Sequence, residues 1–320
     1  MTKNDFKDFR RPFVAENIIF LDEIGSTNDY AKDLAKNGAS AGTAIITAEQ
    51  TAGRGRFGRS WDDGKADGIY MSVLLKPKTN SAHLTLMAGV CVANVLNGLL
   101  GCVDIKLSPA FSADYSATFR QCSFADHLRI CCTHTSTRLC KQSLVRIGEK
   151  SRSKIQPTHL CRHNLDGEQA LIKWPNDIVV CGKKICGILT EGGAFGAVLG
   201  IGINVGRESF PPELSDKATS LRILTGRSFE RAAIIKLLLT ELSAYYEQFE
   251  AHGISSFIDE YRTLCVNIGK TVAVHENSGI YRARAIDVDD DGGLLVELEN
   301  GERRVLNSGE VSVRGVYGYL

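Results

Sequence analysis

The segment AEQTAGRGRFGRSW, residues 48–61, combines two residue types suited to closing over an anion. Its glycines allow positive φ and a close approach of the backbone to a ligand. The arginines at 54, 56 and 59 carry planar guanidinium groups that bind carboxylate and phosphate oxygens through paired hydrogen bonds. We therefore expect a loop that becomes ordered over a small anionic ligand. A nucleic-acid contact and a solvated surface loop are the alternatives, and the position between two predicted strands of a globular core disfavours both. Trp61 either covers an aromatic ligand ring or packs in the core.

A second segment, KWPNDIVVCGKKICGILTE at 173–191, offers a fixed positive charge. The CGKK sequence predicts a tight turn that places Lys183 and Lys184 at the start of a strand. A lysine beside glycine-rich backbone can neutralise a carboxylate or phosphate, although a solvated hairpin tip is the commoner place for a lysine pair. In GIGINV, residues 200–205, alternating glycines would let the backbone lie against a ligand. The amide of Asn204 could read an adenine edge or be satisfied beside a turn.

These segments need a scaffold, and the hydrophobic patterns predict one with two parts. Strands are predicted at 17–24, 43–49, 68–77 and in three short segments within 168–206, and helices at 26–38, 81–100 and 228–253. The last helix carries one apolar stripe, formed by Ile235, Leu238, Leu242, Tyr245 and Phe249. After residue 267 the sequence changes to short β segments separated by DDDGG and ENGE turns, which is typical of a small SH3-like barrel. We place a domain boundary near residue 267.

Composition indicates a globular protein without a global attraction to polyanions. The chain has 320 residues, of which 43% are hydrophobic and 23% charged, and its formal net charge is +1. This charge balance argues against a field that draws the protein to nucleic acid or anionic membranes. The N-terminal segment lacks the apolar core of a signal peptide, and no window approaches about 20 apolar residues. We expect a soluble, cytoplasmic protein.

The segment 102–166 differs from the rest because it shows neither helical nor strand periodicity. It holds six of the ten cysteines. Residues 103–163 include ten Lys and Arg but only four acidic residues, which gives this stretch a local charge of +6. One interpretation is a zinc-binding lobe built from Cys131, Cys132, His134, Cys140, Cys161 and His163, although no paired CxxC spacing supports it. We favour a surface insertion with little order, placed where a long connection costs little.

Taken together, the motifs resemble those of the biotin–protein ligase family. They are STN at 26–28, GRGRFGRSW at 53–61, KWPND at 173–177, GKKICGILTE at 182–191, GIGINV, and a terminal SGEVSVRG. The motifs occur in the family's order and cover the chain from about residue 18 to its end, except for 102–166. The resemblance implies an α+β fold, with a mixed-sheet biotin/lipoate ligase-like catalytic domain at 18–267 and a C-terminal SH3-like β-barrel at 268–320. Residues 1–17 would form an N-terminal extension.

The resemblance also implies roles for individual residues. Biotin would be bound by Ser26, Thr27, Asn28, Gln50, Gly53, Arg54, Gly55, Arg56 and Lys184. ATP would be bound by Arg54, Arg56, Arg59, Trp61, Asn176 and Asn204. Lys184, Arg56 and Asp177 would be catalytic, with Asp177 beside the acceptor lysine. Mg²⁺ would accompany the ATP phosphates, and no metal site is assigned to the protein itself.

The implied reaction joins biotin to a specific lysine of a biotin carboxyl carrier protein, the partner from a biotin-dependent carboxylase, through biotinyl-5′-AMP. A homodimer is possible. About 17 residues precede the first strand, too few for a winged helix, so we expect no DNA-binding role. The alternatives are a lipoate–protein ligase-like acyltransferase and a nucleic-acid-binding or regulatory protein. The GRGRFGRSW and KWPND pair favours biotin, and the acidic balance outside the insertion disfavours nucleic acid.

Overall fold

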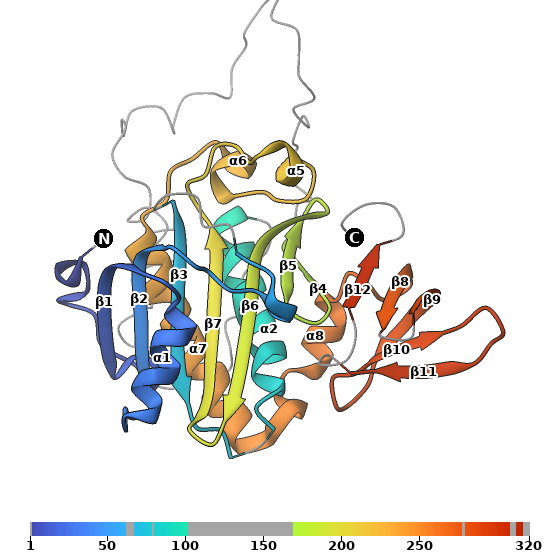
Figure 1. Cartoon of the computed structure of the whole chain (residues 1–320), viewed down its shortest axis with the longest axis horizontal. Coiled ribbons are helices and arrows are strands. Elements are labelled where there is room, and N and C mark those ends of the chain that lie inside the picture. Colours follow the sequence, from blue (N-terminus) through green and yellow to red (C-terminus); the bar gives the residue numbers. More distant parts are fainter. Residues whose placement is uncertain are drawn as a thin grey trace, which may run out of the picture.

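The computed structural model describes residues 2–61, 67–78, 80–101, 169–276, 279–307 and 312–315. Within these ranges the chain forms two sheets of different size, one of seven strands and one of five (Figure 1). The whole 102–166 segment lies outside the described residues, and with it both of its interpretations, the favoured surface insertion and the zinc-binding lobe.

The larger sheet is mixed and has the strand order β1-β2-β3-β7-β6-β5-β4. Its strands are β1 (Asn17–Ile24), β2 (Thr43–Gln50), β3 (Gly68–Leu75), β4 (Leu171–Lys173), β5 (Asp177–Val180), β6 (Lys183–Gly193) and β7 (Gly196–Asn204). β1 and β2 are parallel, and each of the other neighbouring pairs is antiparallel. The β-rich sequence segments therefore form strands, as the patterns predict.

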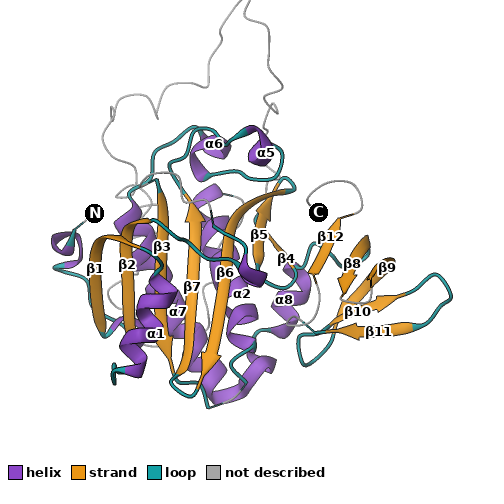
Figure 2. Cartoon of the chain, viewed as in Figure 1, coloured by secondary structure: helices purple, strands orange, loops and turns teal. Residues whose placement is uncertain are grey.

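Helices cover both faces of this sheet (Figure 2). The described helices are α1 (Thr27–Lys36), α2 (His83–Leu100), α5 (Pro212–Ser215), α6 (Leu221–Thr225), α7 (Arg231–His252) and α8 (Ile258–Leu264), with short 3₁₀ turns at Lys3–Phe6, Phe13–Ala15, Arg56–Gly58 and Gly253–Ser256. On one face α1 packs against Ile45, Leu74 and Val198. On the other, the neighbouring strand residues Ile46 and Val73 belong to the core that α2 and α7 share. This alternation is the period-2 pattern of a strand that is buried on both faces.

The long helices begin and end close to the predicted residues. The side chain of Ser26 caps α1 by accepting a hydrogen bond from the backbone N–H of Asp29 at 3.5 Å. Gly101 ends α2 in the left-handed conformation, with φ of 78°. The predicted stripe of α7 is buried along its whole length. The helix α2 is long and apolar enough to cross a membrane, but 83% of its residues are buried inside the protein, as in a core helix.

The smaller sheet has the order β11-β10-β9-β8-β12 and is antiparallel throughout. Its strands are β8 (Thr271–Glu276), β9 (Gly279–Val288), β10 (Leu294–Glu297), β11 (Arg303–Leu306) and β12 (Ser312–Gly315). This arrangement fits the predicted SH3-like domain. The Trp174 indole N–H joins the two parts by donating to the Gly292 carbonyl at 3.0 Å, and the Tyr261 hydroxyl of α8 donates to the Pro175 carbonyl at 3.2 Å.

Candidate active site

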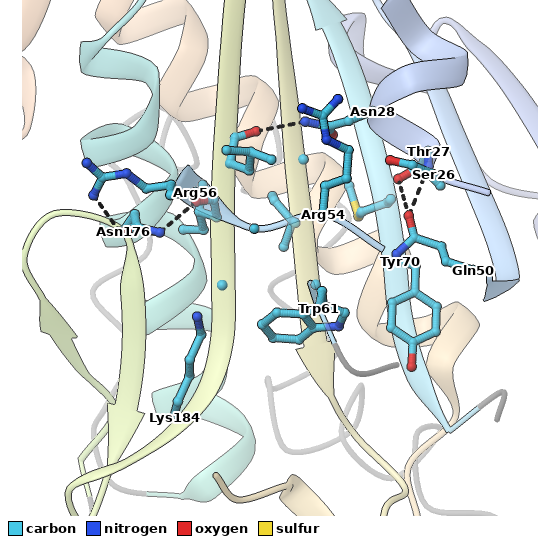
Figure 3. A pocket seen from close by; sticks show the side chains of 18 residues that line it. Ser26, Thr27, Asn28, Gln50, Arg54, Arg56, Trp61, Tyr70, Asn176 and Lys184 are labelled. Atoms are coloured by element: carbon cyan, nitrogen blue, oxygen red, sulfur yellow. Dashed lines mark hydrogen bonds between the residues drawn. The ribbon is translucent and has the colours of Figure 1, made fainter. Parts of the chain in front are cut away.

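A pocket opens on the larger sheet where β6 and β7 run beneath the glycine–arginine loop (Figure 3). It encloses about 490 Å³, part of it open to solvent. It is lined by Ser26, Thr27, Asn28, Gln50, Arg54, Gly55, Arg56, Trp61, Tyr70, Met71, Asn176, Lys184, Gly187, Ile188, Leu189, Gly200, Ile201 and Gly202. Five sequence segments, at 26–28, 50–61, 70–71, 176–189 and 200–202, thus meet at one cavity.

One end of the pocket is neutral and rich in hydrogen-bonding groups. The backbone N–H and the hydroxyl of Thr27 both donate to Oε1 of Gln50, at 2.9 and 3.1 Å. The Gln50 oxygen is therefore an acceptor within the protein, which leaves its amide Nε2 as the donor available to a ligand. Parallel pairing brings these residues together, because Gln50 ends β2 opposite Ile24, two residues before Ser26.

Asn28 belongs to a buried network below this end of the pocket. The hydroxyl of Ser72, on β3, lies 2.7 Å from both Thr27 Oγ1 and Asn28 Oδ1. Gly200 faces Asn28 so closely that a Cβ there would lie 2.1 Å from Asn28 Oδ1. Glycine at this position thus makes room for the Asn28 side chain. The alternating glycines of GIGINV were expected to admit a ligand, and at Gly200 the structure shows a side chain in that role.

The opposite end of the pocket carries positive charge. Lys184, at the start of β6, lies with its Nζ 2.6 Å from Asp177 Oδ1 and 5.1 Å from the centre of the Trp61 ring. Its neighbour Lys183 donates instead to the Ser215 carbonyl at 2.9 Å, outside the pocket lining. Adjacent residues of a strand face opposite sides, so one lysine of the pair serves the pocket.

Trp61 lies between the loop and the sheet. A Cβ at Gly187 would lie 2.7 Å from the Trp61 ring, and one at Gly202 would lie 2.9 Å from it. These two glycines form a flat floor that accepts the indole. The Trp61 indole nitrogen is buried and has no hydrogen-bond partner among the described residues. A buried N–H of this kind favours an added acceptor, because leaving it unmatched costs about 1–3 kcal/mol.

Arg56 reaches the pocket from the glycine–arginine loop. Its guanidinium Nη1 donates to Asn176 Oδ1 at 3.0 Å, which connects the loop to the KWPND segment. Burial lowers the pKa of the Arg56 guanidinium, and the nearby charge of Asp177 opposes that shift. Phe57, the next residue, adopts a left-handed φ of 56° and is 57% exposed. The loop thus turns sharply at Phe57 and directs Arg56 inward.

Not every predicted site residue lines the pocket. Gly53 and Asp177 are adjacent to it, since Gly53 packs against Gln50 and Trp61, and Asp177 pairs with Lys184. Arg59 is exposed. The Asn204 amide is buried and donates to the Thr219 carbonyl at 3.0 Å, which matches the alternative of an amide satisfied beside a turn. The structure does not bring Arg59 or Asn204 into this cavity.

Sequence reasoning missed the apolar floor and wall of the pocket. These residues are Tyr70, Met71, Ile188, Leu189 and Ile201. Tyr70 and Met71 belong to β3, which was predicted only as a strand, whereas Ile188, Leu189 and Ile201 lie inside the two motifs of β6 and β7 but were given no role of their own. The signal that could have found them is strand pairing, because each of the five lies directly opposite a residue of GIGINV or is itself in that motif.

The fold and the pocket agree with the comparisons to known proteins. The chain belongs to the biotin/lipoate A/B protein ligase family, whose model matches residues 20–207. Residues 268–314 match the biotin protein ligase C terminal domain, which narrows the resemblance to the biotin branch.

Individual relatives are similar over most of the chain. A bifunctional ligase/repressor of Bacillus spizizenii is 28% identical over 305 residues, covering 92% of this chain and 74% of the relative. A biotin–[acetyl-CoA-carboxylase] ligase of Mycobacterium tuberculosis is 27% identical, covering 91% of this chain and 88% of the relative. A solved biotin protein ligase of Aquifex aeolicus, in complex with biotin and ATP, has a TM-score of 0.67 and 25% identity, covering 94% of this chain and 99% of that one.

Proposed function

We propose that this chain is an ATP-dependent biotin–protein ligase that activates biotin as biotinyl-5′-AMP and transfers it to a lysine of a carrier protein. The observation that carries the proposal is the polarity of one pocket. Its neutral end presents Ser26, Thr27 and Gln50, and its other end presents Lys184 and Arg56. Biotin has the same polarity, with a neutral ureido ring at one end and a carboxylate at the other.

The neutral end supports biotin over lipoate. The ureido group carries a carbonyl acceptor and two N–H donors, and the Ser26 hydroxyl and the Gln50 amide can meet such groups directly. The dithiolane ring of lipoate has no polar hydrogen and only weak sulfur acceptors, so it would leave the Ser26 hydroxyl and the Gln50 amide N–H without a matching ligand group. Unmatched groups of this kind reject a ligand strongly.

In the first step, the carboxylate of biotin attacks the α-phosphate of ATP, and pyrophosphate leaves. Two anions must approach each other, and Lys184 and Arg56 reduce their repulsion from fixed positions. Lys184 already holds the Asp177 carboxylate at 2.6 Å, so in this proposal its ammonium turns from Asp177 to the biotin carboxylate. Mg²⁺ enters with the nucleotide as MgATP and shields the phosphates.

In the second step, the ε-amine of the acceptor lysine attacks the acyl carbon of biotinyl-5′-AMP. The C–N bond forms, AMP leaves, and the amine loses one proton. Asp177 is the proposed acceptor of that proton, because its carboxylate borders the pocket at the Lys184 end. The mixed anhydride must be kept from water until then, and the loop that carries Arg56 and Trp61 covers it.

The finer assignments are part of the same proposal. The acceptor is a biotin carboxyl carrier domain, and the relatives named as biotin–[acetyl-CoA-carboxylase] ligases support this class. A cytoplasmic location suits an enzyme that consumes ATP. The possible homodimer and the absence of DNA binding stay predictions. Arg59 and Asn204 stay predicted ATP contacts, to be tested by substitution.

The test is to incubate the protein with biotin, MgATP and a biotin carboxyl carrier domain, and to detect protein-linked biotin. Label that requires ATP supports the proposal. A parallel reaction with lipoate in place of biotin tests the main alternative, and retention of DNA or RNA on a filter tests the nucleic-acid alternative. Lipoyl label without biotinyl label, or nucleic-acid retention with no label at all, would contradict it.

A further inference from the structure

Arg54, the first arginine of the glycine–arginine loop, makes ion pairs that point away from the cationic end of the pocket. Its guanidinium Nη1 pairs with the carboxylate of Asp29, and its Nη2 lies 3.5 Å from Glu191 Oε1. Lys32 Nζ lies 2.7 Å from Asp29 and 2.9 Å from Glu191. Two cations and two anions therefore form one network, which joins the loop to α1 and to β6.

The network also reaches the binding pocket. The second oxygen of Glu191, Oε2, accepts a hydrogen bond from Asn28 Nδ2 at 2.8 Å. Asn28 lines the pocket beside Thr27, and Glu191 is itself mostly buried, with 21% of its side chain exposed. The Glu191 carboxylate that pairs with Arg54 is thus held in place by Asn28, a pocket residue of α1.

Short backbone bonds make the loop a single hairpin. Gly55 N–H donates to the Arg59 carbonyl at 2.7 Å, and Trp61 N–H donates to the Gly53 carbonyl at 2.9 Å. Between them, Arg54 forms a β-bridge with Ser60. Because the hairpin is held internally, an anchor at Arg54 restrains the whole loop, including the turn from which Arg56 projects.

Two anchors hold this hairpin from opposite sides of the pocket. Arg54 is tied to α1 and β6, and Arg56 is tied to Asn176 at 3.0 Å. Figure 3 shows the two arginines diverging from the loop, with Arg54 beside Asn28 and Arg56 beside Asn176. The loop therefore spans the pocket with a fastening at each edge.

We propose that Asp29 and Glu191 are positioning residues that hold the glycine–arginine loop over the bound vitamin through Arg54. The proposal rests on the proposed ligase function for the identity of the ligand. In this proposal Arg54 anchors the loop at the biotin end of the pocket, and its guanidinium does not contact the phosphates of ATP. The charge count agrees, because the positive charges of Arg54 and Lys32 are matched by Asp29 and Glu191.

The pKa of the Asp29 carboxyl supports this geometry. Its burial would raise the pKa, but hydrogen bonds from Lys32 and Arg54 outweigh burial and lower it. The Asp29 carboxyl is therefore ionised at neutral pH and able to pair with Arg54 and Lys32.

The experiment compares Asp29→Asn, Arg54→Gln and the double variant in the full-length protein. Asp33→Asn is the matched control, since Asp33 lies on the same helix but pairs with exposed Lys36 and is itself 70% exposed. We expect Asp29→Asn and Arg54→Gln each to raise the KM for biotin about 3- to 10-fold, to leave the KM for ATP unchanged, and to combine without a further increase. The control should behave like the wild type.

A second readout does not depend on activity. Chymotrypsin cleavage after Phe57, followed by mass spectrometry of that single bond, reports opening of the loop. We expect Asp29→Asn and Glu191→Gln to accelerate this cleavage several-fold and Asp33→Asn to leave it unchanged.

Three results would overturn the proposal. The first is a KM for ATP that rises in Arg54→Gln but not in Asp29→Asn. This result would indicate that Arg54 contacts the phosphates of ATP directly. The second is full additivity of the two changes. The third is a cleavage rate that no network variant alters. Failure of the ligase function is distinguishable, because the wild type would then give no ATP-dependent label while the cleavage comparison would still report on the loop.

Discussion

Lys184 offers the sharpest test of the proposed chemistry, because the chain supplies its own control in the preceding residue. Lys184→Met removes the ammonium that contacts Asp177 at 2.6 Å and lies 5.1 Å from the Trp61 ring. Lys183→Met removes an ammonium bound to the Ser215 carbonyl, outside the pocket lining. Both variants lose the same charge from the same strand, so global electrostatics cannot account for a difference between them.

The expected size follows from the contacts that are lost. A hydrogen bond between charged groups contributes roughly 1.5–3 kcal/mol, which corresponds to about 10- to 150-fold in the Kd for biotin. Charge that develops during attack on the phosphate is stabilised more strongly, and removing one preorganised donor costs about 100- to 1,000-fold in kcat. Asp177 adds to the loss, because its carboxylate then faces the incoming biotin carboxylate without the Lys184 ammonium.

The assay measures biotinyl-5′-AMP formation by chromatography, and biotin binding by calorimetry, for both variants and the wild type. We expect Lys184→Met to lose at least 100-fold in the rate of adenylate formation and Lys183→Met to stay within about 2-fold. Equal losses in both variants would refute the reasoning, since the effect would then come from net charge. A Lys184→Met rate near that of the wild type would refute the proposed role directly.

Three further predictions follow from other parts of the molecule. Arg56→Gly removes the guanidinium bound to Asn176, so activated biotin should escape from the pocket and label lysines of other proteins. A biotin blot of an added protein that is not a biotin carrier measures this labelling. Unchanged acceptor selectivity would count against the loop as a cover. Burial raises the pKa of Glu241 to about 7 from 4.5, so below about pH 7 Glu241 is protonated in the native state, and its burial destabilises the fold increasingly as pH rises from 4.5 to 7. Glu241→Gln should then stabilise the protein by about 3 kcal/mol at pH 8 and by little at pH 4.5, while exposed Glu247→Gln should not, as denaturant unfolding would show. Deleting 103–165 should leave biotinylation intact, and a deletion variant that folds but is inactive would contradict the interpretation of that segment as a surface insertion.

The scaffold was largely predictable because its signals are local. The strands and long helices follow from hydrophobic period, and their ends follow from caps such as Ser26 and Gly101. The motif residues meet because parallel pairing of β1 with β2 sets Gln50 beside the start of α1. The short helix α8 (Ile258–Leu264) was not predicted, since seven residues give too little periodicity to separate a helix from a connection.

The finer site was less predictable because its contacts join residues far apart in the chain. Asp29 and Glu191 are 162 positions apart, and nothing in either local sequence indicates that both contact Arg54. The glycines of GIGINV suggested close backbone approach to a ligand, but only the fold shows that Gly200 accepts Asn28. The space above a glycine depends on which side chains of neighbouring elements pack against it, so the sequence of a single strand does not determine it.

The described contacts give the three loop arginines different electrostatic situations, although their chemistry is the same. Arg54 is matched by two carboxylates, and Arg59 is exposed to solvent. Arg56 is half-buried, and within the described ranges its hydrogen-bond partner is the neutral amide of Asn176. Burial lowers the pKa of the Arg56 guanidinium, which means that the fold bears a cost for keeping this charge out of water.

That cost makes Arg56 the arginine best prepared for an anion. Arg54 would have to give up its pairs with Asp29 and Glu191 to bind a phosphate, and that exchange would cancel part of the gain. Arg56 is already partly removed from water and its hydrogen-bond partner is neutral, so it has no direct ion pair to exchange when an anion binds. The same reasoning explains why a chain of net charge +1 can hold two anionic substrates together, because the positive charges that matter, Arg56 and Lys184, are gathered at one pocket.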